Sequence, residues 1–201
     1  MSVSMAGLKN SEIVIGEGIT EVYYLDSLRD ILLTRPKAKE LRPYNMEELE
    51  KAIKYYADEG RTAIHCLIDM DNKVNNVSNM QKYQRLKQKY DGKIVKKTEC
   101  TVRFYESYPS IETFFYFYFD GSTSEKSNNE LKSWLNHRCG YETKARYAFH
   151  KAFVNNGGCL KSAIINAKNS VRLRADGSYN CKYSEMGDFI EHLGVIDTVN
   201  K

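Results

Sequence analysis

The sequence predicts an α/β fold, in which a mainly parallel β-sheet is flanked by helices and followed by a helical C-terminal extension. Strand-like and helix-like patterns alternate over the first half of the chain, which is typical of a parallel sheet with right-handed crossovers. After Pro109 the patterns become helical. The 201 residues, 42% of them hydrophobic, provide enough apolar surface for one sizeable core with a modest helical annex.

Each element of the first half is indicated by its apolar spacing and its end signals. A strand begins near Glu12 with the apolar residues 13–15. Thr20 can cap the helix that follows, whose apolar positions recur as far as Leu32 and which ends at Arg35-Pro36. A short strand is expected next. A second helix begins at Asn45, its expected cap, and its apolar stripe stops at Gly60. This order is strand, helix, short strand, helix.

The alternation continues to the middle of the chain. Residues 62–68 are rich in β-forming apolar side chains, as in a buried strand. A basic helix begins at Ser78 and ends near Tyr90, and residues 93–106 return to extended structure. The helices expected beyond Pro109 lie at residues 110–119, 128–139, 143–155, 159–174 and 184–193. The aromatic run in the first of these is apolar on every helical face, which predicts a buried helix.

Composition argues against several classes of protein. No stretch approaches the roughly 20 apolar residues that cross a bilayer, and residues 1–10 lack an apolar signal core. The five cysteines are widely spaced, without a Cys-x-x-Cys pair, so neither a cysteine zinc site nor a disulfide framework is expected. We therefore expect a cytoplasmic protein that does not bind membranes. The net charge of +4 does not by itself indicate a nucleic-acid partner.

Acidic residues follow the two clearest strands. Glu17 comes after the first, and Asp69 and Asp71 come directly after the second. Ligands of open α/β sheets bind at the carboxyl ends of strands, so these side chains should face one crevice, and extended backbone would point Asp69 and Asp71 the same way. Crowded carboxylates repel, and a hard cation such as Mg²⁺ removes that cost. The pattern suggests a divalent metal site, although acidic residues after strands are also common turn formers.

Four segments resemble a known family. Residues 17–21, Glu-Gly-Ile-Thr-Glu, resemble the first signature of Toprim domains, and residues 68–71, Ile-Asp-Met-Asp, resemble the second. Residues 107–114, Ser-Tyr-Pro-Ser-Ile-Glu-Thr-Phe, resemble the Ser-Asn-Pro-x-x-Glu-x-Trp segment of the RloB-like Toprim branch. Residues 183–186, Tyr-Ser-Glu-Met, are similar to the Pro-Ser-Thr-Glu-Val close of that branch. The acidic positions are all kept, and the departures are three aromatic residues, Tyr108, Phe114 and Tyr118.

The resemblance implies a Toprim-like (Rossmann-like) core over residues 9–108, completed in the same compact fold by a helical portion over residues 109–201. It further implies a metal-dependent nuclease that hydrolyses DNA or RNA in bacterial anti-phage defence, with Mg²⁺ as cofactor and Mn²⁺ able to substitute. One or two metal ions would suit the number of acidic positions. The catalytic residues that the resemblance implies are Glu17, Asp69 and Asp71, and the metal-binding ones are Glu17, Glu21, Asp69, Asp71, Glu112 and Glu185.

Two basic stretches, within residues 82–97 and 161–174, could neutralise phosphates of a nucleic acid. A further pair after Gly140 could do the same. Such runs are also typical of a solvated helix face. The candidate nucleic-acid contacts are Lys82, Arg85, Lys144, Lys168 and Arg172.

Two other functions stay open at this point. The chain could be a nucleic-acid-binding or sensor subunit of a defence complex that needs a partner protein, or a second copy of itself, for activity. It could also transfer nucleotides, as in primer synthesis. Metal titration and product analysis distinguish these functions from an autonomous nuclease.

His65 lies inside a strand and is expected to be structural.

Overall fold

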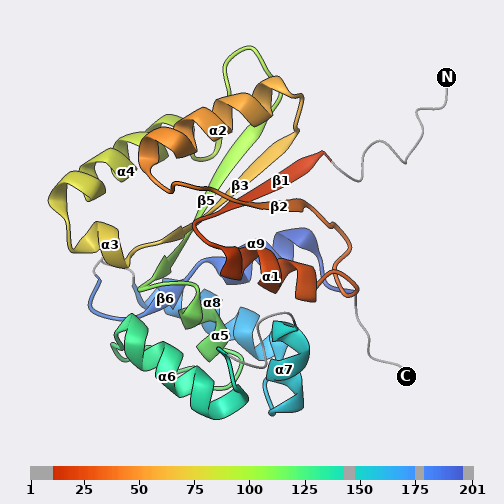
Figure 1. Cartoon of the computed structure of the whole chain (residues 1–201), viewed down its shortest axis with the longest axis vertical. Coiled ribbons are helices and arrows are strands. Elements are labelled where there is room, and N and C mark those ends of the chain that lie inside the picture. Colours follow the sequence, from red (N-terminus) through yellow and green to blue (C-terminus); the bar gives the residue numbers. More distant parts are fainter. Residues whose placement is uncertain (1–10, 143–147, 175–178, 197–201) are drawn as a thin grey trace.

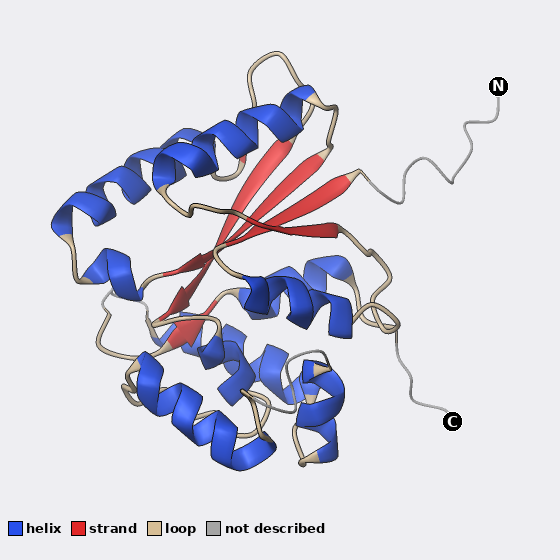
Figure 2. Ribbon diagram, viewed as in Figure 1, coloured by secondary structure: helices blue, strands red, loops and turns tan. Residues whose placement is uncertain are grey.

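The computed structural model describes residues 11–142, 148–174 and 179–196. Within these ranges the chain forms a six-stranded sheet with helices on both faces, as Figure 1 and Figure 2 show. The strands are β1 (Glu12–Gly16), β2 (Lys37–Glu40), β3 (Ala63–Asp69), β4 (Lys93–Ile94), β5 (Thr101–Tyr108) and β6 (Tyr183–Ser184). The helices are α1 (Ile19–Ser27), α2 (Met46–Asp58), α3 (Asp71–Val74), α4 (Val77–Tyr90), α5 (Glu112–Tyr116), α6 (Asn128–Cys139), α7 (Phe149–Asn155), α8 (Leu160–Leu173) and α9 (Met186–Leu193).

The sheet is mixed and mostly parallel. Its order is β2-β1-β3-β5-β4, and β6 also pairs with β5. The strands β1, β2, β3 and β5 are parallel, whereas the short β4 and β6 are antiparallel to β5. The predicted fold class, α/β with a mainly parallel sheet and helices in the C-terminal portion, is confirmed. The carboxyl ends of β1, β3 and β5 consequently meet at one edge, where Asp69 is in register with Ser107.

The two faces of the sheet carry separate apolar cores, because side chains alternate along each strand. Ile64, Cys66 and Ile68 of β3 pack with residues of α2 and α4 on one face. Leu67 belongs to the core of the other face, which includes residues of α1 and of α5 to α9. In Figure 1 the helices α2 and α4 accordingly lie above the sheet, and α1 and α9 lie below it.

The aromatic helix α5 is at the centre of the second core. All five of its residues are buried, so the predicted buried helix is confirmed, although it ends at Tyr116 and not at residue 119. Tyr24 of α1 packs against Phe115, with ring centroids 4.9 Å apart. The Tyr24 hydroxyl lies 2.8 Å from that of Tyr118, and this hydrogen bond satisfies both groups inside the core.

Two predicted helix starts are wrong. Thr20 is the second residue of α1; Gly18 is the N-cap, and its N–H donates to the side chain of Glu21. The helix α4 begins one residue before Ser78, because the side chain of Asn76 accepts a backbone N–H of the first turn. In both cases a polar side chain near the predicted start satisfies a free helical N–H and sets the boundary.

Other elements differ mainly in length. The Asn45 cap of α2 is confirmed, since its side-chain oxygen accepts the backbone N–H groups of the first turn. The first helix ends at Ser27, well before its predicted end at Arg35-Pro36. Of the helix expected at residues 143–155, the structure shows α7, and residues 143–147 lie outside the described ranges. Within those ranges, no helix has the length and apolar character needed to span a membrane.

Candidate active site at the carboxyl edge of the sheet

Glu17 and Glu21 reach the carboxyl edge through the turn between β1 and α1. The turn is tight: a Cβ atom added to Gly16 would lie 2.8 Å from Cβ of Glu21. The Gly18 N–H donates to Oε2 of Glu21 at 3.2 Å, which folds this carboxylate back onto the turn. Glu21 is therefore buried, with 3% of its surface exposed.

Glu17 is held by the end of β3 and by a buried lysine. Its Oε1 accepts the backbone N–H of Asp69 at 3.0 Å and the Nζ of Lys73 at 2.6 Å. The same ammonium donates to the carbonyl oxygen of Asp69. The Lys73 side chain is 5% exposed, and its Nζ lies 5.2 Å from the centroid of the Tyr44 ring. This ion pair joins the turn after β1 to the end of β3.

Asp69 and Asp71 differ from the expected extended arrangement. Asp69 ends β3, but Asp71 begins α3, so the prediction that extended backbone aligns them is wrong. The cause is a tertiary contact, because the Asp71 N–H donates to the carbonyl of Pro109 at 2.9 Å and the chain turns there. Oδ1 of Asp69 accepts the Ile111 N–H at 2.8 Å, and Oδ2 of Asp71 accepts from Asn128 at 3.2 Å.

Glu112 contributes a further buried carboxylate from α5. It is 4% exposed. Its Oε2 accepts from the hydroxyl of Ser110 at 2.6 Å, and its Oε1 accepts from that of Tyr141 at 2.7 Å. Lys132 of α6 approaches the same Oε1 at 3.6 Å. Glu112 is thus fixed by three side chains from the C-terminal half of the chain.

Burial, with a further contribution from mutual repulsion, raises the pKa values of several of these carboxylates. Burial raises the pKa of Glu21 to about 8, and the charges of Glu17 and Glu112 add to this effect. Burial likewise raises the pKa of Asp69 well above its ordinary value, with the charges of Glu21 and Glu17 as the next causes. Burial also raises the pKa of Glu17, although Lys73 opposes the shift. The region therefore favours the uptake of protons or of a cation.

Two pockets give solvent access to this edge. One, of about 470 Å³, is lined by Glu17, Lys73 and, from α4, Lys82. The other, of about 710 Å³, is lined by Asp71 and by residues 125–130. The carboxylates of Glu17 and of Asp71 are therefore each reachable from outside, through different pockets.

Glu185 is placed in a different cluster. Its carboxylate accepts the backbone N–H of Glu106 at 2.8 Å, and burial, with the charge of Glu106, raises its pKa to about 7. Glu106 in turn contacts Lys87 at 2.6 Å and Arg174 at 3.2 Å. Its side chain lies on the face of the sheet that α4 covers, whereas Asp69 lies on the face of α1. The structure does not bring Glu185 to the other carboxylates.

The candidate nucleic-acid contacts are divided between two surfaces. Lys82 and Arg85 line a groove of about 210 Å³ between α2 and α4, next to the pocket of Glu17. Lys168 and Arg172 lie on α8, where Lys168 forms a 2.6 Å ion pair with α9. Lys144 lies outside the described residues. Of the candidates that the structure describes, Lys82 thus lies in the pocket of Glu17 and Arg85 in the adjoining groove, whereas Lys168 and Arg172 lie on α8.

Sequence reasoning missed several residues of the site. Lys73 follows Asp71 by two positions, and nothing in that spacing distinguishes a buried lysine from a surface one. Asn128 begins α6 and reaches Asp71 only through the tertiary fold. Tyr44 precedes α2; its hydroxyl is buried without a hydrogen-bond partner among the described residues, and burial and the charge of Glu17 raise its pKa.

The residues present fit a hard divalent cation. Carboxylate oxygens are the donors that Mg²⁺ prefers, and the buried hydroxyl of Tyr44 is a further polar group beside Glu17. In the described ranges no three of these carboxylates each bring an oxygen within 4.8 Å of the others. Glu17 is bonded to Lys73, and Asp71 to Asn128. The donor type therefore suits the ion, whereas the described geometry does not bring three of these carboxylates to one point.

Comparison with known proteins adds one finding. The family model described as RloB-like protein matches residues 13–193, which extend from β1 to the end of α9. Neither the curated proteins nor the solved structures contain a match to the chain. The matched region includes the turn after β1, the end of β3 and α5, which carry the carboxylates described above. Because the family model covers far more than half of the sequence, the chain belongs to the RloB-like protein family.

Proposed function

We propose that this protein is a metal-dependent nuclease with a Toprim-type core, which hydrolyses phosphodiester bonds of DNA or RNA. The observation that carries the proposal is the set of buried carboxylates at the carboxyl edge of the parallel sheet, where burial and mutual repulsion raise the pKa of Asp69. Such a set gains more from a bound cation than separate carboxylates do. The resemblance of residues 17–21 and 68–71 to the Toprim signatures supports the same function.

The metal ligands in this proposal are Glu17, Asp69 and Asp71, with Mg²⁺ or Mn²⁺ as the ion. The chemistry that a bound ion supplies is neutralisation of charge on the phosphate and activation of water. Glu21 and Glu112 lie close enough to raise the pKa of Asp69, and they add negative charge behind the ligands. In this proposal Glu21 and Glu112 therefore increase the affinity of the site for the cation.

Basic and amide side chains of the protein would bind the phosphates and orient the carboxylates. Lys73 holds Glu17, and its ammonium lines the pocket where a phosphate would enter. Lys82 lines the same pocket and Arg85 the adjoining groove, so both can neutralise phosphates of a bound strand. Asn128 orients Asp71 by donating to its Oδ2. These residues position the polynucleotide and the carboxylates with respect to each other.

The test compares variants that keep the hydrogen bonds of the site. Asp69→Asn retains an oxygen that accepts the Ile111 N–H, and Glu17→Gln retains one for the Asp69 N–H. Purified full-length protein is incubated with single-stranded DNA, duplex DNA and transfer RNA, with and without Mn²⁺. We expect metal-dependent cleavage that both variants lose. Asp58→Ala, at an exposed site near the end of α2, serves as the control that keeps activity.

Full activity in either carboxylate variant would refute the assignment. A second candidate, a nucleic-acid-binding subunit that needs a partner, is favoured by one observation: Lys73 already neutralises Glu17 in the isolated chain. If the protein binds Mn²⁺ through Asp69 but cuts none of the substrates alone, the partner-dependent function is supported. The RloB-like resemblance implies that such a partner, and the nuclease itself, would act in bacterial anti-phage defence.

A further inference from the structure

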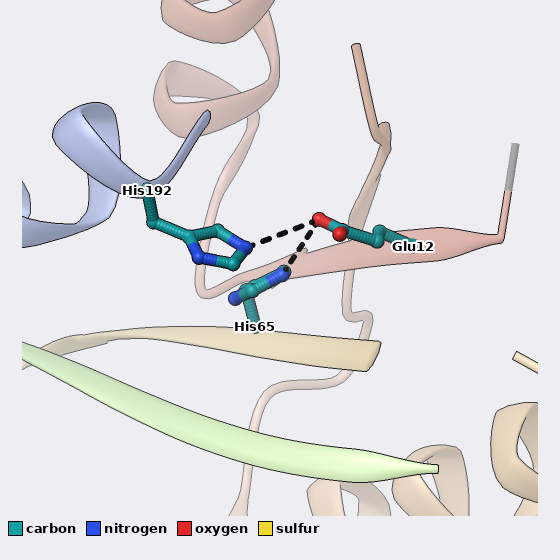
Figure 3. A group of neighbouring side chains, drawn as sticks. All are labelled: Glu12, His65 and His192. Carbon is teal, nitrogen blue, oxygen red and sulfur yellow. Dashed lines mark hydrogen bonds and ion pairs between the residues drawn. The ribbon is translucent and has the colours of Figure 1, made fainter. Parts of the chain in front are cut away.

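A second group of potential metal ligands lies away from the carboxyl edge of the sheet. It consists of Glu12, the first residue of β1, His65 of β3 and His192 of α9 (Figure 3). One ligand atom from each residue lies within 4.8 Å of the other two. Asp69 is four residues further along β3, about 13 Å away at about 3.3 Å per residue. The group is therefore separate from the candidate active site.

The three side chains converge on one point. Nε2 of His65 lies 3.1 Å from Oε2 of Glu12, and Nε2 of His192 lies 3.5 Å from the same oxygen. Figure 3 shows both imidazole rings directed at this carboxylate. In a tetrahedral zinc site with bonds of about 2.05 Å, neighbouring ligand atoms lie about 3.3 Å apart. The two measured separations fall on either side of that value.

The environment of the ligands also suits a metal. The His65 side chain is 2% exposed and packs against Tyr105 and Phe189, with ring centroids 5.8 and 5.4 Å away. Its Nδ1 has no hydrogen-bond partner among the described residues, so Nε2 is the nitrogen with a polar neighbour. The His192 side chain is 48% exposed, which leaves the ion a path from solvent. One ligand is thus fixed in the core and another is accessible.

We propose that Glu12, His65 and His192 form a binding site for a borderline divalent ion of the zinc class. Two imidazole nitrogens and one carboxylate oxygen are typical zinc ligands, and a water molecule would complete the tetrahedron. Mg²⁺ prefers oxygen ligands throughout, so it does not compete well at this site. The bound ion would attach α9 to the first and third strands of the sheet, and it would act there as a structural clamp.

The experiment measures binding of Zn²⁺ and Co²⁺ to chelator-treated, full-length protein. In excess Mg²⁺, which would fill the proposed carboxylate site, we expect one Co²⁺ per chain, with visible bands of a tetrahedral nitrogen–oxygen site and without the ultraviolet bands of cobalt–thiolate bonds. His192→Ala and Glu12→Gln should each weaken binding at least about tenfold, because each removes or neutralises a ligand. His137→Ala, which removes an exposed histidine of α6, is the matched control and should bind as the unchanged protein does.

Thermal unfolding provides a second readout. Zn²⁺ should raise the Tm of the unchanged protein and of His137→Ala, but not that of His192→Ala, because only a ligand that binds the folded state stabilises it. Since His192 is half exposed, its replacement leaves the core packing in place, and circular dichroism confirms folding. Equal affinity in His192→Ala, thiolate bands in the cobalt spectrum, or the absence of stoichiometric binding would each overturn the proposal.

Discussion

The replacement Glu21→Gln provides a quantitative test of the repulsion among the buried carboxylates. The glutamine amide keeps an oxygen that can accept the Gly18 N–H, but it never ionises. Burial raises the pKa of Glu21 from 4.5 to about 8, so the stability that this group contributes is complete below pH 4.5 and is lost as the pH rises toward 8. At pH 7.5 the folded state keeps Glu21 protonated, whereas the unfolded chain has released this proton. This pH lies about 3 pH units above the pKa of 4.5 that Glu21 has in the unfolded chain. At about 1.36 kcal/mol per unit this costs about 4 kcal/mol.

We therefore expect Glu21→Gln to raise the free energy of unfolding by up to about 4 kcal/mol at pH 7.5 and to leave it nearly unchanged at pH 4.5. Urea denaturation across this pH range measures both values. Glu99→Gln, at an exposed glutamate, is the control and should show no such pH-dependent gain. If the Glu21→Gln gain is the same at both pH values, or is absent at pH 7.5, the argument from burial and repulsion fails. Saturating Mg²⁺ should reduce the gain, because a cation favours the ionised carboxylates.

Three further outcomes are expected. Glu106→Ala should lower the free energy of unfolding by about 3 kcal/mol in urea titrations, because Lys87 loses its buried partner. The pKa of Glu106 is lowered to about 2 despite its burial, so this contribution is present above pH 4.5 and is lost as the pH falls toward 2. Tyr118→Phe should cost about 1 to 3 kcal/mol, because it leaves the buried Tyr24 hydroxyl without this partner. The exposed Cys159 thiol, whose pKa is lowered by hydrogen bonds at the start of α8, should be alkylated before the three buried thiols, as mass spectrometry of the labelled protein would show.

The fold was predicted well from the sequence where an element is defined by the apolar periodicity and the end signals of its own residues. The strands at β1 and β3 and the helix after Asn45 were each indicated by apolar periodicity and end signals, and the structure contains them. The start of α1 was missed because Gly18 is the N-cap and its N–H donates to the side chain of Glu21, whereas Thr20 already lies inside the helix. Helix boundaries of this kind depend on one side chain's conformation, which periodicity does not encode.

The candidate site was predictable only in its acidic members. Acidic residues at strand ends are visible in the sequence, and Glu17 and Asp69 do lie together. Lys73 and Asn128 were missed because they reach the site through the turn at α3 and through the docking of α6, which are tertiary events. Glu185 was grouped with the other carboxylates by resemblance. In the structure it belongs to the cluster of Glu106, whose side chain lies on the face of the sheet opposite to that of Asp69 because side chains alternate along the strands.

The carboxylates at the sheet edge are held by segments that are synthesised after them. A nascent chain that ends at residue 108 already contains Glu17, Asp69 and Asp71, but it lacks the amide that binds Asp69 and the side chain that binds Asp71, both of which belong to residues 111–128. β6, which completes the edge of β5, is made later still. The carboxylates would therefore acquire their final arrangement only after these later segments have been made, so a nascent chain that lacks them would not carry a finished site.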